Sequence, residues 1–225
     1  MSDAFYRFIR TVGSPIFDLT ARPTVRGVEH IPARGPFILA CTHQSYFDVP
    51  IIIRHTPRHL DIVSITEVFK NPLVAWFYGS LNAFPLERSR ADPATVRTIL
   101  TRLEKGRVVA MFPEGRIQPG DASVLRSGKI RRGIGRIATL ANVPIVPCVI
   151  LNSAAYIRPA AWLPFRRTRY TLAYGPPIPP TAEPEAIEAD LVAAFRTLSS
   201  FPPLLRSSTQ AGRATPNPPP TLPLP

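Results

Sequence analysis

The sequence has few cysteines and few histidines. Its 225 residues contain two cysteines and four histidines. Cys41 and Cys148 each lie inside an apolar run, so buried free thiols on strands are the expected outcome. Two such cysteines make no disulfide framework, which favours a reducing compartment. No closely spaced set of cysteine and histidine side chains is present, so no metal site is expected.

Long apolar runs are also missing. No segment reaches the ~18 consecutive apolar residues that are needed to span a bilayer. The first residues lack the unbroken apolar stretch of a secretory signal, because Arg7 and Arg10 interrupt the pattern. If the protein works on lipid, we expect it to do so from the membrane surface.

Acidic residues are outnumbered by basic ones. The 27 Lys and Arg residues against 15 Asp and Glu give a net charge of +12. A positive field attracts anionic partners whatever the fold. Nucleic acid, an anionic membrane and a phosphorylated substrate are all compatible with this charge. The length is ordinary for one domain with a sizeable core.

The hydrophobic pattern predicts alternating strands and helices. Continuous apolar runs, typical of strands buried on both faces, lie at residues 37–41, 108–112 and 143–151, and a further strand is predicted at 60–65. Helical spacing is found at 49–55, 74–78, 94–104, 130–141 and 185–200. This alternation predicts a single α/β layered domain with a mostly parallel sheet flanked by helices.

An amphipathic pattern precedes this domain. Residues 4–19 carry apolar side chains at helical spacing, and Gly13 and Pro15 predict a short helix that breaks and then turns. The apolar stripe suits either packing on the protein's own core or the headgroup zone of a membrane. The segment 162–167 also sets aromatic side chains beside arginines, as interfacial anchors do.

The end of the sequence differs in composition. From Phe201 it is rich in Pro, Ser and Thr, which cannot bury enough apolar surface to offset the entropy of ordering. The predicted organisation is therefore an amphipathic, membrane-contacting segment over 1–24, one domain over 25–200 and a disordered tail over 201–225.

One histidine lies where catalytic residues of α/β folds are commonly found. His43 follows the predicted strand 37–41, and catalytic groups of α/β folds cluster past the carboxyl ends of strands. Asp48 can fold back across the strand-to-helix turn and fix the tautomer of the ring, which leaves the other nitrogen as a base. Such a base could deprotonate an alcohol. A helix N-cap with an incidental histidine is the alternative.

Further polar groups follow other predicted strands. Glu114, Gly115 and Arg116 come after strand 108–112, and Arg88 ends a short strand predicted within 79–88. An arginine there could fork onto a phosphate, although a surface loop is the plainer interpretation. A basic cluster, which suits either an anion-binding or a solvated face, contains Arg126, Lys129, Arg131, Arg132 and Arg136. Because no G-x-S-x-G elbow is present, these groups favour direct acyl transfer from an activated donor.

The motifs, taken in order, resemble the glycerolipid acyltransferase family that includes lysophosphatidic acid acyltransferases. The resemblance covers roughly residues 25–175 and rests on residues 25–32, 42–48 with its His-x4-Asp pattern, 79–88, 112–116 and 143–147. The family's commonest third motif has a threonine before its arginine, whereas here Arg116 follows Gly115 directly.

The resemblance implies roles for individual residues. His43 would be the general base on the acceptor hydroxyl and Asp48 its orienting partner. The substrate site would be formed by Arg88, Glu114, Gly115, Arg116, Lys129 and Pro144. Within that set, Arg88 and Arg116 would hold the acceptor phosphate, and Pro144 would shape the acyl pocket.

The implied reaction moves a fatty acyl group from acyl-CoA or acyl-carrier protein to a hydroxyl of lysophosphatidic acid or a related lysophospholipid or glycerol phosphate, in phospholipid biosynthesis. No cofactor or metal is expected, since the thioester is a substrate. We expect a peripheral or monotopic enzyme on the cytoplasmic face of a membrane. Two rivals remain: an enzyme with a covalent serine intermediate at Ser45, and a basic nucleic-acid-binding module, although no recognition motif for nucleic acid is legible.

Overall fold

The computed structural model describes residues 3–65, 76, 79, 81–86, 93–118, 120–164 and 167–200. Several predictions lie outside these residues. They concern Arg88, most of the helix at 74–78 and the tail from residue 201 onward.

The described residues form one seven-stranded sheet with the order β1-β7-β6-β2-β5-β3-β4. Neighbouring strands are parallel, except for the antiparallel pair of β6 and β7. The strands are β1 (Ala21–Arg26), β2 (Phe37–Cys41), β3 (Leu60–Ile65), β4 (Phe84–Leu86), β5 (Val108–Met111), β6 (Ile145–Leu151) and β7 (Thr168–Tyr174). The prediction of an α/β domain with a mostly parallel sheet is confirmed.

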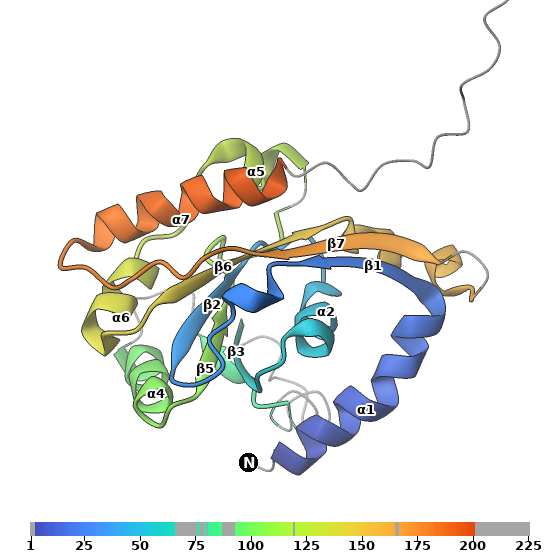
Figure 1. The fold of residues 1–225 in the computed structure, drawn as a ribbon, viewed down its shortest axis with the longest axis horizontal. Coiled ribbons are helices and arrows are strands. Elements are labelled where there is room, and N and C mark those ends of the chain that lie inside the picture. The colour runs from blue at the N-terminus through green and yellow to red at the C-terminus, as the bar shows by residue number, and fades with distance from the viewer. Residues whose placement is uncertain are drawn as a thin grey trace, which may run out of the picture.

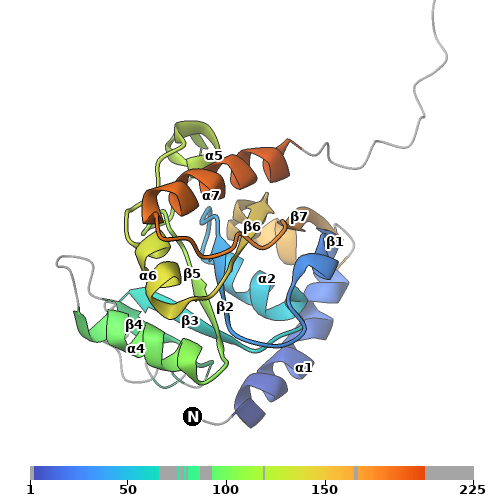
Figure 2. The same cartoon turned by 60° about the vertical axis from the view of Figure 1, so that its left-hand side comes forward.

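Helices cover both faces of the sheet (Figure 1). One face carries α1 (Asp3–Thr20) and α2 (Asp48–His55), and the other carries α4 (Pro93–Glu104), α6 (Ile134–Ala141) and α7 (Pro184–Ser199), with the short α5 (Val124–Ser127) beside α7. Figure 2 shows the same two layers from a second side. Short 3-10 helices are η1 (Val28–His30), η3 (Gly120–Ala122), η4 (Ser153–Ile157) and η5 (Pro159–Trp162). Within the described part of the chain, no helix is long and apolar enough to cross a membrane.

The side chains of β2 explain why its sequence is apolar throughout. Phe37, Leu39 and Cys41 point into the layer that holds α1 and α2. Ile38 and Ala40 point into the layer that holds α4, α6 and α7. All are buried, so no position of this central strand can be polar. The prediction of two buried free thiols is also confirmed, because Cys41 and Cys148 are both buried and neither forms a disulfide. The two residues are register partners on β2 and β6.

The predicted break in the N-terminal helix is wrong. Helix α1 runs unbroken from Asp3 to Thr20 and contains Pro15. Most helical stability in proteins comes from packing of one face rather than from local propensity. Here Tyr6 is fully buried, and its hydroxyl accepts a hydrogen bond from the N–H of Leu60 at 3.4 Å.

The opposite face of α1 is apolar and exposed. Phe8, Val12 and Leu19 are exposed there, while Tyr6 and Ile9 pack against the core. Packing on the protein's own core is therefore confirmed for the face that carries Tyr6 and Ile9, and contact of the exposed face with a membrane stays a prediction.

A buried ion network ties the start of α1 to the sheet. Asp61 of β3 is fully buried and pairs with Arg102 and Arg107, and Arg107 also reaches Asp3 at 3.3 Å. Asp3 therefore lies near the amino ends of β3 and β5. The other end of α1 leads into β1 at Ala21, whose register places it beyond the carboxyl end of β6. Helix α1 thus extends from the amino ends of β3 and β5 to a point beyond the carboxyl end of β6.

His55, at the end of α2, should make stability sensitive to acid. Its Nε2 lies 2.6 Å from the Tyr170 hydroxyl. Burial, reinforced by the charge of Arg54, lowers the pKa of His55 from 6.5 to about 4. The folded state therefore takes up the proton less readily than the unfolded state, so stability that is present above pH 6.5 is lost as the pH falls toward about 4.

We expect His55→Gln to flatten the dependence of Tm on pH across this window, whatever its effect at neutral pH. Thermal unfolding of both proteins at several pH values measures it. Parallel curves for the two proteins would show that His55 does not carry this acid sensitivity.

Candidate active site

The carboxyl ends of β2 and β5 bring two distant loops together. These strands are parallel neighbours, so their carboxyl ends meet at one edge of the sheet, here called the carboxyl edge. His43 follows β2, and Glu114 follows β5. The backbone N–H of His43 donates to Oε1 of Glu114 at 2.8 Å. Residues that lie 71 positions apart in the sequence are thus in direct contact.

His43 and Asp48 form the predicted pair. Nδ1 of His43 lies 2.9 Å from Oδ2 of Asp48, which is fully buried. The same oxygen accepts hydrogen bonds from the backbone N–H groups of Gln44 at 2.7 Å and Ser45 at 2.9 Å. These donors precede α2, so the carboxylate serves the histidine loop and not the first turn of the helix as an N-cap.

This geometry leaves Nε2 of His43 as the basic atom. An ionised carboxylate is an acceptor only, so the Nδ1 that faces Asp48 carries the proton. The ring stacks on Phe112, with 4.1 Å between centroids. Its side chain remains 16% exposed, which lets a substrate approach. A ring that is oriented in this way can take a proton from a hydroxyl.

Glu114 holds the His43 loop in place. Its Oε1 accepts from His43, and its Oε2 accepts from the N–H of Val124 at 3.1 Å. Burial raises the pKa of Glu114, while the two backbone donors and His43 favour the charged form. Gln118 adds a second link, because its N–H donates to the carbonyl oxygen of His43 at 2.9 Å. Glu114 is therefore a positioning residue, a role that the sequence did not reveal.

Because Gly115 has no Cβ, the side chain of Arg131 can lie directly against its backbone. The φ of Gly115 is +71°, in the left-handed region, and a Cβ there would come within 2.4 Å of Cδ of Arg131. The Arg131 side chain therefore lies across Gly115. The N–H of Arg131 also donates to the carbonyl oxygen of Pro113 at 2.8 Å.

A cationic pocket of about 250 Å³ lies beside this loop, and its lining residues are Glu114, Arg116, Gln118, Lys129, Ile130 and Arg131. It brings together the predicted Glu114, Arg116 and Lys129. The pocket also contains Arg131, a member of the basic cluster to which the sequence alone assigns no individual role. Both oxygens of Glu114 accept hydrogen bonds from backbone N–H groups, and the cationic side chains that line the pocket suit an anion such as a phosphate.

Pro144 does not join this site. It precedes β6, and its carbonyl oxygen accepts from the N–H of Ile38 at 3.0 Å, at the start of β2. At about 3.3 Å per residue, the strand separates this end from His43 by roughly 16 Å. Pro144 therefore does not lie beside the reacting groups, and its expected role in shaping the acyl pocket stays a prediction.

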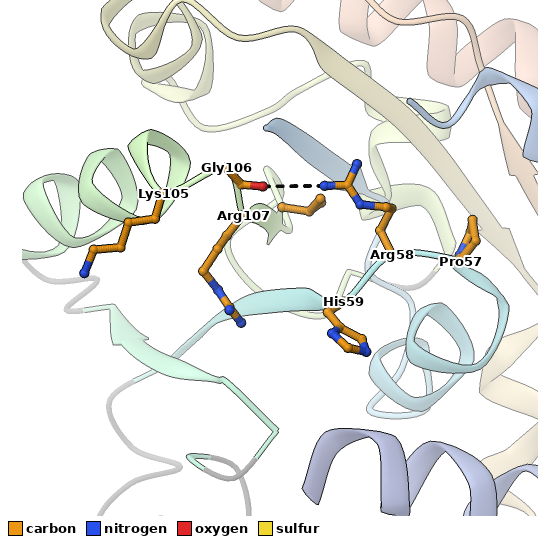
Figure 3. Close-up of a pocket in the computed structure, with 7 residues that line it drawn as sticks. Pro57, Arg58, His59, Lys105, Gly106 and Arg107 are labelled. Atoms are coloured by element: carbon orange, nitrogen blue, oxygen red, sulfur yellow. Dashed lines mark hydrogen bonds between the residues drawn. The ribbon is translucent and has the colours of Figure 1, made fainter. Parts of the chain in front are cut away.

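A second pocket, of about 400 Å³, lies at the amino ends of β3 and β5 (Figure 3). Its arginines are already engaged. Arg58 donates to the carbonyl oxygens of Pro32, Gly35 and Gly106, the last of which Figure 3 draws, and Arg107 binds Asp61. This pocket is at the opposite edge from His43, so it is not part of the candidate site.

Ser45 is poorly placed to act as a nucleophile. The residue is fully buried, and its Oγ accepts a hydrogen bond from the N–H of Phe47 at 3.1 Å. An attacking serine needs access to the substrate and a base beside its hydroxyl. The contacts of Ser45 instead shape the turn that carries His43.

The fold and the site define a class: α/β proteins that carry a histidine–aspartate pair beside a cationic pocket at the carboxyl ends of the strands. A family model described as Acyltransferase matches residues 22–151. The chain belongs to this acyltransferase family, which confirms the resemblance, and it is an O-acyltransferase.

Known proteins agree with this assignment. The chain is 27% identical over 175 residues to a 1-acyl-sn-glycerol-3-phosphate acyltransferase of Bacillus subtilis, covering 77% of this chain and 82% of that protein. It is also 27% identical to a yeast (Saccharomyces cerevisiae) protein of the same name, over 60% of this chain and 45% of that one. Among solved structures, it resembles the 1-acyl-sn-glycerophosphate acyltransferase PlsC of Thermotoga maritima, with a TM-score of 0.66, 26% identity, and coverage of 85% of this chain and 77% of that one.

Arg131→Ala should weaken binding of the acceptor. A hydrogen bond to a charged group contributes about 1.5–3 kcal/mol, so KM for a phosphorylated acceptor should rise roughly tenfold or more, with a smaller change in kcat. Steady-state kinetics with varied acceptor measures this. The exposed neighbour Arg132, changed to alanine, is the control. Equal effects of the two substitutions would mean that Arg131 acts through general charge alone.

Proposed function

We propose that this enzyme transfers a fatty acyl group from a thioester to the free hydroxyl of 1-acylglycerol 3-phosphate (lysophosphatidic acid). The observation that carries the proposal is the meeting of the His43–Asp48 pair and the cationic pocket at one edge of the sheet. The names of the similar proteins from Bacillus subtilis and Thermotoga maritima support this acceptor.

The pocket supplies positioning and the histidine supplies the base. The acceptor phosphate would bind among Arg116, Lys129 and Arg131, which fixes the glycerol hydroxyl next to Nε2 of His43. Holding two reactants in this way removes much of the entropic barrier. Nε2 takes the hydroxyl proton as the oxygen attacks the thioester carbon. The tetrahedral intermediate then expels the thiolate, which receives the proton from the imidazolium.

Asp48 stabilises the charged ring that forms during this step. The buried carboxylate holds Nδ1–H through both protonation states of Nε2, so the ring does not turn. No acyl-enzyme is required, in keeping with the buried position of Ser45. The donor, acyl-CoA or acyl-carrier protein, is consumed as a substrate, and the proposal includes no cofactor. The predicted contact of Arg88 with the phosphate would add a further cation.

We further propose that the enzyme is peripheral, on the cytoplasmic face of a membrane, with α1 as a contact. The face of α1 that carries Phe8, Val12 and Leu19 is exposed and apolar, with Arg7 beside it. Helices with an apolar face and flanking basic residues lie in the headgroup zone. The acceptor would then be drawn from the same membrane.

A panel of acceptors tests the reaction. Purified enzyme receives labelled acyl-CoA or acyl-carrier protein together with lysophosphatidic acid, glycerol 3-phosphate or monoacylglycerol. We expect lysophosphatidic acid to be the best acceptor, and monoacylglycerol, which has the same hydroxyl without the phosphate, to react at least about a hundredfold more slowly, as two lost charge-assisted contacts imply. Equal rates for these two acceptors would show that the pocket does not bind phosphate. Competition between the two thioesters identifies the donor.

A further inference from the structure

The connection between β6 and β7 combines basic and apolar surface. Between Asp121 and Glu183 the sequence contains no acidic residue. Within the connection and at the start of β7, Arg158, Arg167 and Arg169 are exposed. An acid-free, arginine-bearing surface of this kind attracts an anionic partner.

Two apolar side chains project from the same connection. Ile157, at the end of η4, is 62% exposed, and Leu163, directly after η5, is 52% exposed. The part of the connection that contains η4 and η5 packs on the protein: Tyr156 is buried, and Nε1–H of Trp162 donates to its carbonyl oxygen at 3.0 Å. Ile157 and Leu163 are therefore presented by a fixed scaffold.

This scaffold contacts the histidine loop. The ring of Phe47 lies 5.3 Å from Trp162 and 5.8 Å from Tyr156, measured between centroids. Tyr46, the neighbour of Phe47, is exposed. The connection follows β6, whose carboxyl end lies beside that of β2, so it stands at the same edge as His43.

The end of α1 meets the same surface. The buried side chain of Thr20 lies beside that of Tyr156, and its neighbour Leu19 is exposed. Figure 1 shows the junction of α1 and β1 at the same end of the molecule as the start of β7. We call the set of exposed apolar residues at this end the apolar rim; it consists of Leu19, Tyr46, Ile157 and Leu163.

Exposed arginines on β1 and β7 lie at the same end of the molecule as the apolar rim. Arg22 of β1 pairs in register with Arg169 of β7, and both are exposed. The sequence has no acidic residue between Asp18 and Glu29, and Asp18 itself is paired with Arg54 at 3.0 Å. The basic charge at this end is therefore not neutralised locally.

We propose that the apolar rim is a second membrane contact, which docks the carboxyl edge itself onto an anionic bilayer. Isolated apolar side chains from three separate elements, flanked by arginines, suit the headgroup zone, where side chains enter lipid singly while guanidinium groups meet phosphates. The inference rests on the proposed function, because an acceptor held in the bilayer must reach His43. If α1 were the only contact, the enzyme could rotate about that helix on the membrane surface. Contact through both α1 and the apolar rim would fix its orientation, with His43 facing the lipid.

The double variant Ile157→Ser with Leu163→Ser tests the rim. Its control is Leu140→Ser, since Leu140 is 60% exposed on α6, at the other end of the molecule. We expect the double variant to bind vesicles of phosphatidylcholine and phosphatidylglycerol about tenfold or more weakly in flotation assays. The control should bind as the wild type does. Equal binding of the double variant and the control would overturn the proposal.

A second pair of variants tests the charges. Arg158→Gln with Arg169→Gln should lose about fivefold in binding for each arginine on anionic vesicles, and little on pure phosphatidylcholine. Arg136→Gln, an exposed arginine on α6, is the matched control. A loss of about fivefold in the control, equal to the loss for each arginine of the pair, would show that net charge, and not this surface, decides binding.

Activity separates this proposal from the proposed function. With a short-chain, monomeric lysophosphatidic acid in solution, the rim variant should work at the wild-type rate, while with acceptor embedded in vesicles it should be slower. A loss in solution as well would assign the rim to the substrate site and overturn the membrane role. If the wild type transfers no acyl group to the soluble acceptor, the proposed function fails, and vesicle binding alone decides on the rim.

Discussion

Replacing His43 with alanine is expected to slow acyl transfer by about 10²- to 10⁴-fold, the usual contribution of a general base. Asp48 holds Nδ1 of the ring at the carboxyl edge, and in the proposed reaction Nε2 takes the hydroxyl proton. The measurement is kcat/KM with a labelled thioester and lysophosphatidic acid. Circular dichroism and thermal unfolding establish that the variant is folded.

A matched histidine at the other edge is the control for this result. His59 lies at the amino end of β3, in the pocket of Figure 3, and contacts Asp3. His59→Ala should retain most of the activity. Normal turnover by the folded His43→Ala protein would remove His43 from the chemistry and leave the anion pocket as a binding site alone.

Glu114→Ala should reduce both stability and activity. It leaves the N–H groups of His43 and Val124 without their acceptor, at a cost of about 1–3 kcal/mol for each group that water does not reach. The His43 loop then loses its link to the β5 loop, and a displacement of about 1 Å can lower the rate roughly a hundredfold. Urea unfolding and kcat/KM measure the two effects.

The conservative change Glu114→Gln refines this test. An amide has one carbonyl oxygen, so it can replace one of the two acceptor contacts, and intermediate stability and activity are expected. If Glu114→Ala were as stable as the wild type and yet inactive, Glu114 would act on the substrate, as the sequence resemblance implied, rather than on the loop.

The sequence predicted the centre of the sheet well, for a physical reason. Strands β2, β5 and β6 are buried on both faces, so their runs are continuously apolar and easily recognised. Strand β7 was not predicted, because Arg169 and Thr171 alternate with apolar residues on a strand that is partly exposed. The break expected at Pro15 did not occur, since the buried face of α1 outweighs local propensity.

The candidate site was predicted in part. His43 and Asp48 are close in sequence, so their spacing revealed the pair. Glu114 binds the backbone of the His43 loop, and Arg131 packs over Gly115. Both contacts join segments that are distant in sequence, so no local pattern predicts them. Pro144 lies at the other end of the sheet from His43, and its expected role in the acyl pocket stays a prediction, because a motif identifies a strand without saying which of its ends faces the reaction.

A double-mutant cycle on the histidine and aspartate tests the central claim most directly. We compare kcat/KM for His43→Ala, for Asp48→Asn, which preserves the volume of the buried side chain, and for the protein with both changes. If the carboxylate acts through the ring, the double variant should be no slower than His43→Ala, because residues that work as a unit are not additive. Losses that multiply in the double variant would contradict the account, since the aspartate would then contribute independently of the histidine.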